Sequence, residues 1–467
     1  MRIPKIRDYV IKNLKYIMKP RSIAIIGAAR EPGKIGNQVV KNLIDGGFNG
    51  KIYPINPKAD QILGLKAYPT VKDVPDDVDL AIIVVPARVV KSVIQDCVEK
   101  KVKGIVVITS GFSEVGNREL EDEIVSMCRK YKIPLIGPNV VGVLNATQKV
   151  NASFGPKLPY KGKIGFVSQS GALVIALIGW TWNQRVGMST IVSIGNKADV
   201  DFSELIVYFA EEDPDTNAVA LYIEGLDAGP EFVEACKRAS KKIPIIALKA
   251  GISERGSLAA MSHTGSMAGS ARIYRAVFKQ AGVILAENLE DLYDRSLALS
   301  LQPPARKDLI MVITNGGGAG VISTDAAEKY GIPLQDTPRD LVPKMKQYMP
   351  PFGSAKNPVD LTGMARPEDY YGAVVDALKH PEVGGVVVLY CHTAITNPMD
   401  LAKKMYEASK VAENENKPLV VCFIGGEEVD RASIWLKENG VPTYPSPMRA
   451  MSAMSALREY GRLLEKL

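Results

Sequence analysis

His263 is one of only three histidines in the chain, and its place in the sequence suits a reactive group. Most residues of the surrounding segment, 250–271, are Gly, Ala or Ser, with no aromatic or aliphatic cluster around the histidine. The segment follows a predicted strand, 244–249, so it forms a loop at the carboxyl end of a strand, where open α/β sheets bind ligands. A flexible linker with an incidental histidine is the alternative. Small residues would let such a loop move, and its placement favours a catalytic role for His263.

Glu224 is the carboxylate that could assist this histidine, because it directly follows a predicted buried strand. It would either cap the next helix or pair with His263, and the pairing would hold one ring nitrogen and leave the other nucleophilic. The other two histidines have structural interpretations. His380 is predicted to end a helix, and His392, at the end of a strand, is favoured as structural over a ligand role.

A glycine-rich turn at Gly27, Gly33 and Gly36 joins a strand to a helix, so its backbone could approach a phosphate at the helix N-terminus. The spacing departs from GxGxxG, and a purely structural turn is the alternative. The next strand leads to Asn56 and Lys58 and not to the acidic residue that would hold a nicotinamide ribose. Lys58 suits an additional phosphate. Coenzyme A carries a 3′-phosphate, so CoA is favoured over NAD.

Two further turns have the same strand-to-helix character. Ser170 and Gly171 follow an apolar strand, and there an anion site and a plain N-cap are equally compatible with the sequence. The segment Gly316–Gly320 is glycine at every position except Ala319. Because glycine is costly to order, and a tight turn needs only one or two, this segment predicts a second anion-binding cradle.

Parallel strands must position these turns. Short apolar runs without polar alternation, as found here, are typical of strands buried on both faces of a parallel sheet, and they alternate with helical patterns. We therefore predict an α/β protein of three doubly wound domains, residues 1–145, 146–302 and 303–467, with a Pro-rich linker at 301–308. The predicted strands are Ser22–Gly27, Lys51–Asn56, Leu80–Val85, Gly104–Ile108, Pro134–Gly137, Lys163–Val167, Ile191–Ile194, Ala218–Ile223, Pro244–Lys249, Gly282–Leu285, Leu309–Thr314, Gly385–Tyr390, Pro418–Phe423 and Pro442–Tyr444.

Composition excludes several classes of protein. The length of 467 residues fits roughly three average domains. Although 46% of the residues are hydrophobic, the chain has no apolar run long enough for a membrane span. Its five cysteines form no CxxC pair or metal spacing, so a disulfide framework and a zinc site are both unexpected, and a reducing cytoplasm fits. The net charge of +7 is mild and forms no basic stripe, which disfavours nucleic acid. The basic N-terminal segment is expected to be a helix packed on the body and not a targeting peptide.

Several motifs together resemble one known family over almost the whole chain, from about Ser22 to Tyr460. The chain resembles the alpha subunit of ADP-forming (NDP-forming) acetyl-CoA synthetase, within the succinyl-CoA synthetase superfamily. The most specific motifs are SHTGxxAGS, SQSGAL and KNPVDLTG. The motifs are a VIGAxxxxGKxG-like turn at Ile26–Gly36, YPxNPK at Tyr53–Lys58, IGPN at Ile136–Asn139, SQSGAL at Ser168–Leu173, SHTGxxAGS at Ser262–Ser270, TNGGGxG at Thr314–Gly320, KNPVDLTG at Lys356–Gly363 and GGEEV at Gly425–Val429.

The resemblance implies a Rossmann-like CoA-binding domain followed by two flavodoxin-like, succinyl-CoA synthetase-like domains. It also implies that His263 is phosphorylated during turnover and that Glu224 steadies it. The phosphate-binding helix N-termini would comprise Ser170, Gly171, Gly317, Gly318, Ala319 and Gly320. The CoA-binding positions would be Gly27, Arg30, Lys58, Pro86, Thr109 and Asn139.

The activity that this resemblance implies is that of an acid–thiol ligase, which converts acyl-CoA, ADP and phosphate to a carboxylic acid, ATP and CoA through an acyl phosphate and a phosphohistidine. We find no P-loop and expect no metal site in this chain. A separate ATP-grasp beta subunit is expected to bind ADP or ATP with Mg²⁺, in an α2β2 assembly in the cytoplasm. The alternatives are a non-catalytic CoA-binding or regulatory scaffold, a nicotinamide-dependent oxidoreductase and a protein acetyltransferase.

Overall fold

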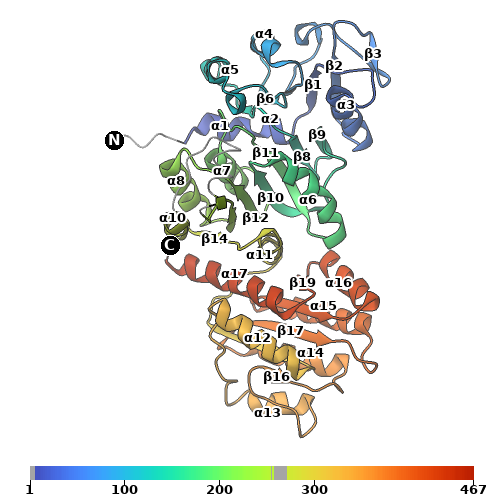
Figure 1. Ribbon diagram of the computed structural model, residues 1–467. Helices are drawn as coiled ribbons and strands as arrows, with labels where there is room; N and C mark the ends of the chain where they lie inside the picture. The colour runs from blue at the N-terminus through green and yellow to red at the C-terminus, as the bar shows by residue number, and fades with distance from the viewer. Residues whose placement is uncertain (1–5, 254, 257–270, 467) are drawn as a thin grey trace. The chain divides into compact units, whose positions relative to one another are not determined.

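Parallel β-sheets, each with helices on its faces, organise the chain (Figure 1). The computed structural model describes residues 6–253, 255–256 and 271–466. His263 lies outside the described residues. The chain divides into two units, residues 1–183 with 187–285 and residues 184–186 with 286–467. The first unit contains the first and second sheets, and the second unit contains the third.

The first sheet is parallel and has the order β2-β1-β5-β6-β7. Every residue of β1, β5 and β6 is buried, which explains why the sequence shows apolar runs without alternation. Its strands are β1 (Ser22–Ile26), β2 (Lys51–Ile55), β5 (Leu80–Ile83), β6 (Gly104–Val107) and β7 (Leu135–Ile136), with a small hairpin of β3 (Gln61–Ile62) and β4 (Leu65–Lys66). Its helices are α3 (Ile35–Asp45), α4 (Ala87–Glu99) and α5 (Arg118–Lys130), with the 3-10 helices η1 (Val71–Asp73) and η2 (Ser113–Val115).

The second sheet has the order β14-β13-β12-β10-β11-β8-β9, in which the last two strands are antiparallel additions to a parallel sheet. The N-terminal helices α1 (Asp8–Asn13) and α2 (Lys15–Met18) pack on this unit through buried Val10, Leu14 and Ile17, as predicted for the N-terminal segment. The strands are β8 (Gly142–Asn145), β9 (Val150–Ser153), β10 (Lys161–Ser168), β11 (Met188–Ser193), β12 (Ala218–Ile223), β13 (Ile245–Lys249) and β14 (Val283–Leu285). The helices are α6 (Gly171–Gln184), α7 (Phe202–Glu211), α8 (Gly229–Ala239) and α10 (Ala271–Ala281).

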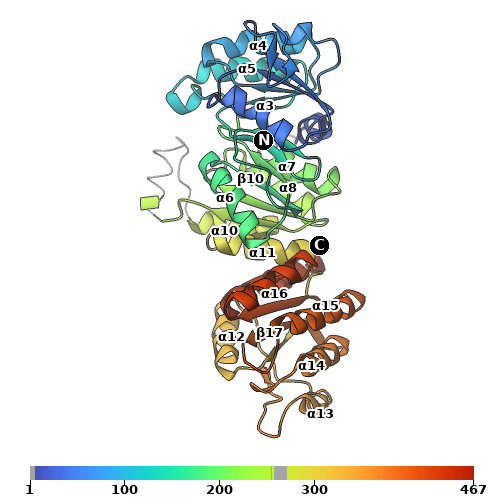
Figure 2. The same ribbon diagram turned by 90° about the vertical axis from the view of Figure 1, so that its right-hand side faces the viewer.

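The third sheet has the order β16-β15-β17-β18-β19, and Figure 2 shows α12 on one side of β17 and α14 and α15 on the other. Its strands are β15 (Leu309–Thr314), β16 (Val359–Asp360), β17 (Val383–Cys391), β18 (Leu419–Ile424) and β19 (Thr443–Tyr444). Its helices are α11 (Leu289–Leu301), α12 (Gly317–Lys329), α13 (Val342–Met345), α14 (Pro367–Lys379), α15 (Pro398–Asn414), α16 (Glu427–Glu438) and α17 (Pro447–Lys466), with the 3-10 helix η3 (Lys346–Tyr348).

Helix α11 packs on α17 inside the second unit. Arg449 of α17 donates to both carboxylate oxygens of Asp294 on α11, at 2.6 and 2.8 Å. Burial raises the pKa of Asp294 to about 6, although Arg449 acts in the opposite direction. Contacts therefore place residues 289–301 with the third sheet, while the domain limits 1–145, 146–302 and 303–467 stay predictions.

All of these sheets share one plan. Counted along the chain, the parallel strands of each sheet have the order 2-1-3-4-5, with the first strand between the second and the third. The order reverses between the first and third strands, so the topological switch points lie at β1/β5, β10/β12 and β15/β17. Open α/β sheets bind ligands at the carboxyl ends of the strands beside such points. The predicted α/β class, with three doubly wound sheets, is confirmed.

Among the helices that the structure describes, none combines the length and hydropathy needed to span a bilayer.

Candidate functional site

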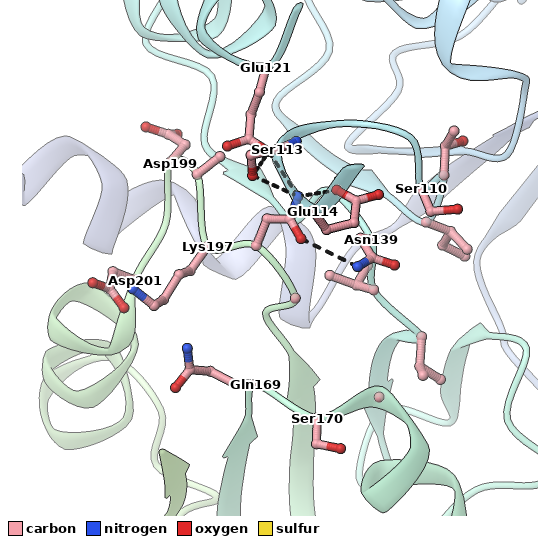
Figure 3. Close-up of a pocket in the computed structure, with 18 of the residues that line it drawn as sticks. Ser110, Ser113, Glu114, Glu121, Asn139, Gln169, Ser170, Lys197, Asp199 and Asp201 are labelled. Atoms are coloured by element: carbon pink, nitrogen blue, oxygen red, sulfur yellow. Dashed lines mark hydrogen bonds between the residues drawn. The ribbon is translucent and has the colours of Figure 1, made fainter. Parts of the chain in front are cut away.

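A cavity of about 1800 Å³ lies in the first unit, at the carboxyl ends of strands from the first and second sheets (Figure 3). Typical ligand pockets measure about 300–1,000 Å³, so this cavity has room for a ligand of cofactor size. Six of the predicted site residues line it. They are Pro86, Thr109, Asn139, Ser170, Gly171 and Glu224.

The loops after β5, β6 and β7 hold the first three of these residues. Pro86 precedes α4, and the Thr109 hydroxyl donates to the Val85 carbonyl at 2.7 Å. The Asn139 backbone N–H donates to the Thr109 carbonyl at 2.9 Å. The three loops therefore form one connected wall of the cavity.

Gly27, Arg30 and Lys58 come together elsewhere, at the carboxyl ends of β1 and β2 and outside the lining of the cavity. The Arg30 guanidinium donates to the Lys58 carbonyl at 2.9 Å, and the Lys58 N–H donates to the Asn56 side chain at 2.8 Å. Gly27 has a φ of +95°, which favours glycine. Arg30 and Lys58 thus form a polar group beside Gly27, at the carboxyl ends of β1 and β2.

Gly36 has a packing role that the sequence did not show. A Cβ on this residue of α3 would lie 2.0 Å from the Gly27 carbonyl oxygen, so only glycine lets the helix approach β1 so closely. The sequence analysis explained Gly36 as a residue that lets the backbone approach a phosphate. Contact between helix and strand is sufficient to explain it.

At the switch point of the second sheet, Gln169 joins β10 to β12. Its side-chain oxygen accepts from the backbone N–H groups of Glu224 and Gly225, at 2.6 and 3.0 Å. Ser170 partly caps α6, because its hydroxyl accepts from the Leu173 N–H at 3.4 Å. The N-terminus of α6 and Glu224 thus share one rigid edge of the cavity.

Glu224 is not the N-cap residue of the following helix, since the N-cap of α8 is Ala228. The buried ammonium of Lys249, at the end of β13, donates to the Glu224 carbonyl at 2.8 Å and lies 4.6 Å from the Tyr274 ring centroid. Burial lowers the pKa of Lys249, and Glu224 acts in the opposite direction. Of the two predicted roles for Glu224, the pairing with His263 stays a prediction.

Other charged groups in the cavity wall include an internal ion pair. Lys197, with φ +46°, forms an ion pair with Asp227. Burial raises the pKa of nearby Asp201, while the positive charge of Lys197 lowers it. Within the described ranges, no group of His, Cys, Asp and Glu side chains could hold a metal ion.

The second unit repeats the turn of the second sheet at the start of α12. Thr314 exchanges hydrogen bonds with Gly316 (3.0 and 3.2 Å) as Ser168 does with Ser170 (3.1 and 2.9 Å). Asn315 takes the place of Gln169 and bonds both the N–H and the carbonyl of Cys391 on β17, at 2.8 and 2.9 Å. The two turns therefore share one construction.

The predicted cradle residues Gly317, Gly318, Ala319 and Gly320 form the first turn of α12. A Cβ on Gly317 would lie 3.2 Å from Asp360 Oδ2, whereas a Cβ on Gly318 would meet nothing within 4 Å. Packing in the described residues therefore does not require glycine at the exposed position 318.

The remaining histidines lie in this unit and have side-chain partners. His380 is the C-cap of α14, as predicted, and its Nε2 lies 3.2 Å from Asp340. His392 Nε2 lies 3.8 Å from the Glu428 carboxylate. The side chains of Gln169, Asn196, Lys249 and Asn315 were not among the residues predicted for the site. The only signal for two of them was an amide residue directly after the first strand in both VSQSG and ITNGG.

Comparison with known proteins covers nearly the whole chain. A CoA-binding domain model matches residues 21–146, a succinyl-CoA ligase-like flavodoxin domain matches 161–299, and a ligase-CoA domain matches 310–462. The chain is 46% identical to the ADP-forming acetate–CoA ligase I subunit alpha of Pyrococcus furiosus, covering 96% of this chain and 98% of the relative. It is 44% identical to the ADP-forming acetate–CoA ligase of Methanocaldococcus jannaschii, covering 98% of this chain but 64% of that relative.

A solved structure is similar over the same extent. The acetyl-coenzyme A synthetase 1 of Ca. Korarchaeum cryptofilum, in complex with phosphate and ADP, superposes with a TM-score of 0.92 at 48% identity over 97% of each chain. These relatives are named as ligases or synthetases, so the comparisons favour a catalytic protein over the scaffold alternative. The chain belongs to the family of ADP-forming acetate–CoA ligase alpha subunits.

Proposed function

We propose that this chain is the acyl-transferring alpha subunit of an ADP-forming acyl-CoA ligase, with acetyl-CoA as the first substrate to test. One observation carries the proposal. The cavity brings the N-terminus of α6 and Glu224 together with Pro86, Thr109 and Asn139. A thioester, an anion and a carboxylate partner for a histidine would thus meet in one space.

The proposed reaction has three transfers. Phosphate attacks the thioester carbonyl, and the CoA thiolate leaves to give an acyl phosphate. A ring nitrogen of His263 then attacks phosphorus and releases the carboxylate. The phosphohistidine finally passes its phosphoryl group to ADP. Helix N-termini at Ser170–Gly171 and Gly317–Gly320 would stabilise the phosphoryl oxygens without competing as nucleophiles, and Glu224 would offset positive charge on the ring.

We propose that a separate ATP-grasp beta subunit binds the nucleotide and its Mg²⁺, in an α2β2 assembly. The support is that two Pyrococcus furiosus relatives are named as alpha subunits, and that this chain spans 64% of the Methanocaldococcus jannaschii relative. A cytoplasmic location is also proposed, supported by the free cysteines, four of which are buried.

The test is the intact mass of the purified chain after incubation with acetyl-CoA and phosphate, and again with the ATP-grasp subunit and ATP. We expect a gain of one phosphoryl group that is lost in acid, because phosphohistidine is acid-labile. His263→Ala should abolish the gain, and the matched control His392→Ala should keep it. Full labelling of His263→Ala would show that another residue carries the phosphoryl group.

Replacing Gly318 by alanine is expected to raise stability and slow phosphoryl transfer together. Alanine is favoured over glycine in a helix by about 1 kcal/mol, which corresponds to a Tm increase of about 2–4 °C. The added methyl group would obstruct an anion at the start of α12, so we expect the rate of His263 labelling to fall about tenfold or more. Calorimetry and labelling kinetics measure the two effects.

Gly179→Ala is the matched control. Gly179 lies inside α6, and a Cβ there would also meet nothing within 4 Å. This variant should gain the same stability without losing rate. An unchanged labelling rate in Gly318→Ala would contradict an anion site at α12.

A further inference from the structure

Asn139 is held firmly by its backbone while its side chain faces the cavity. Its N–H donates to the Thr109 carbonyl, and its φ of +63° is one that asparagine tolerates. Gly195 packs so closely behind it that a Cβ there would lie 2.2 Å from the Asn139 carbonyl oxygen. The backbone of Asn139 is therefore fixed, and contacts of the exposed side chain must set which end of its amide faces the cavity.

Asn196 decides that orientation through two carboxylates, those of Glu114 and Glu121, which Figure 3 labels near Asn139. Its Nδ2 donates to Glu114 at 2.6 Å and to Glu121 at 2.8 Å. An ionised carboxylate can only accept hydrogen bonds, so the NH2 end of Asn196 must face the two glutamates. Its Oδ1 then faces the opposite way, toward Asn139.

The hydrogen bond between Asn139 and Asn196 is oriented by the same rule. Asn139 Nδ2 lies 3.3 Å from Asn196 Oδ1 and donates to it. The carbonyl end of Asn139 is therefore on the far side of its amide from Asn196, as Figure 3 shows. Within the part of the chain that the structure describes, this oxygen accepts no hydrogen bond, and Asn139 lines the cavity.

The glutamates are themselves fixed as acceptors. Burial would raise the pKa of Glu114, but hydrogen bonds from Asn196 and from the backbone N–H groups of Gly111 and Phe112 outweigh it and lower the pKa. Glu121 is buried and accepts from the Ser113 hydroxyl at 2.8 Å. Both glutamates are thus held in place, and the lowered pKa of Glu114 favours its ionised form, which accepts.

We infer that Asn196 is a positioning residue, which sets the amide of Asn139 so that its Oδ1 faces the cavity as a hydrogen-bond acceptor for the ligand. The acceptor suits an S–H or amide N–H donor, and the pantetheine arm of CoA carries both. This inference rests on the proposed CoA site. It assigns Asn196, which lies on the loop after β11 and also lines the cavity, a role in recognition that acts through the amide of Asn139.

The test measures the affinity of the full chain for CoA and for desulfo-CoA, which lacks the thiol, by calorimetric titration. Asn139→Gly removes the amide and accepts the positive φ, and we expect about fivefold weaker CoA binding. Asn196→Ala should also weaken CoA binding, by up to the same factor, and wild-type CoA affinity in this variant would overturn the inference. The double variant should bind like Asn139→Gly, because Asn196 acts through Asn139. Asn439→Ala, at an exposed amide after α16, is the control, and melting temperatures verify folding.

The possible results separate the identity of the donor, the role of Asn196 and the CoA site itself. If Asn139→Gly removes a preference for CoA over desulfo-CoA, the donor is the thiol, and if it weakens both ligands equally, the donor is an amide N–H. Wild-type affinity of Asn139→Gly for both ligands would overturn the inference alone, as would independent, additive effects of the two variants. Failure of the wild-type chain to bind CoA would instead overturn the CoA site and the inference with it.

Discussion

Replacing Gly36 by alanine is expected to destabilise the first sheet severely and to abolish CoA binding. The new Cβ would lie 2.0 Å from the Gly27 carbonyl oxygen and 3.1 Å from the Ala28 Cα, and both contacts are with backbone that cannot rotate away. Helix α3 would have to move off β1. Overpacking of this kind typically costs about 1–3 kcal/mol, and here the clash is with a strand end, so we expect the upper end of that range or more.

Comparing Gly36→Ala with Gly179→Ala separates the effect of the clash from the effect of adding a methyl group to a helix. Both substitutions add one methyl group inside a helix and gain the same helix propensity of about 1 kcal/mol, but only position 36 lacks space. We expect Tm to fall by roughly 10 °C in Gly36→Ala and to rise in Gly179→Ala. Calorimetry and CoA titration give the two readouts. Equal melting temperatures for the two variants would show that α3 can move without loss.

Replacing Asp199 by alanine is expected to cost about 3–5 kcal/mol, the range for breaking a buried ion pair. The Asp199 side chain is fully buried and accepts from Arg7, from Arg129 Nε at 2.8 Å and from the Leu135 N–H at 3.1 Å. Its removal leaves a buried N–H of β7 without its acceptor and takes one carboxylate from Arg7, which keeps Glu204 and the Asp199 carbonyl. Because Asp199 also lines the cavity, CoA affinity should fall with stability.

Denaturant unfolding of the full chain measures this cost. Asp199→Asn keeps an acceptor but loses the charge, so it should lie between the wild type and Asp199→Ala. The control is Asp45→Ala, which removes the exposed partner of Lys41 and should change the unfolding free energy by no more than about 0.5 kcal/mol. A similar small change in Asp199→Ala would mean that solvent replaces the lost contacts.

Much of the fold could be predicted from the sequence because parallel strands are buried on both faces. Runs such as Ala218–Ile223 and Leu309–Thr314 are strands with the predicted bounds. The hairpin of β8 and β9 was missed because its buried residues include Asn145, Asn151 and Ser153. These polar side chains are satisfied by tertiary hydrogen bonds, such as that from Asn145 to Thr190, which no local pattern reveals.

The residues of the site also fall into two groups, those that could be predicted from the sequence and those that could not. The positions of the turns at Ser170 and Gly317 follow from local strand-to-helix patterns, so they could be predicted. The roles of Gln169 and Asn196 could not, because each depends on which loop lies opposite in space. Strand order brings Glu224 beside Gln169, and the approach of the loop after β11 to η2 brings Asn196 beside Glu114 and Glu121.

The first strand of each parallel sheet lies between two strands that come later in the chain, and this has a consequence for folding kinetics. β15 pairs with β16 and with β17, both far along the chain, so this part of the sheet forms only after long loops close. Topologies dominated by such distant pairings fold slowly. Until β15 and β18 reach it, the apolar strand Val383–Cys391 has unpaired edges of the kind through which partly folded chains associate. The yield of folded protein is therefore set by competition between intramolecular pairing and chain concentration, and not by the stability of the final structure alone.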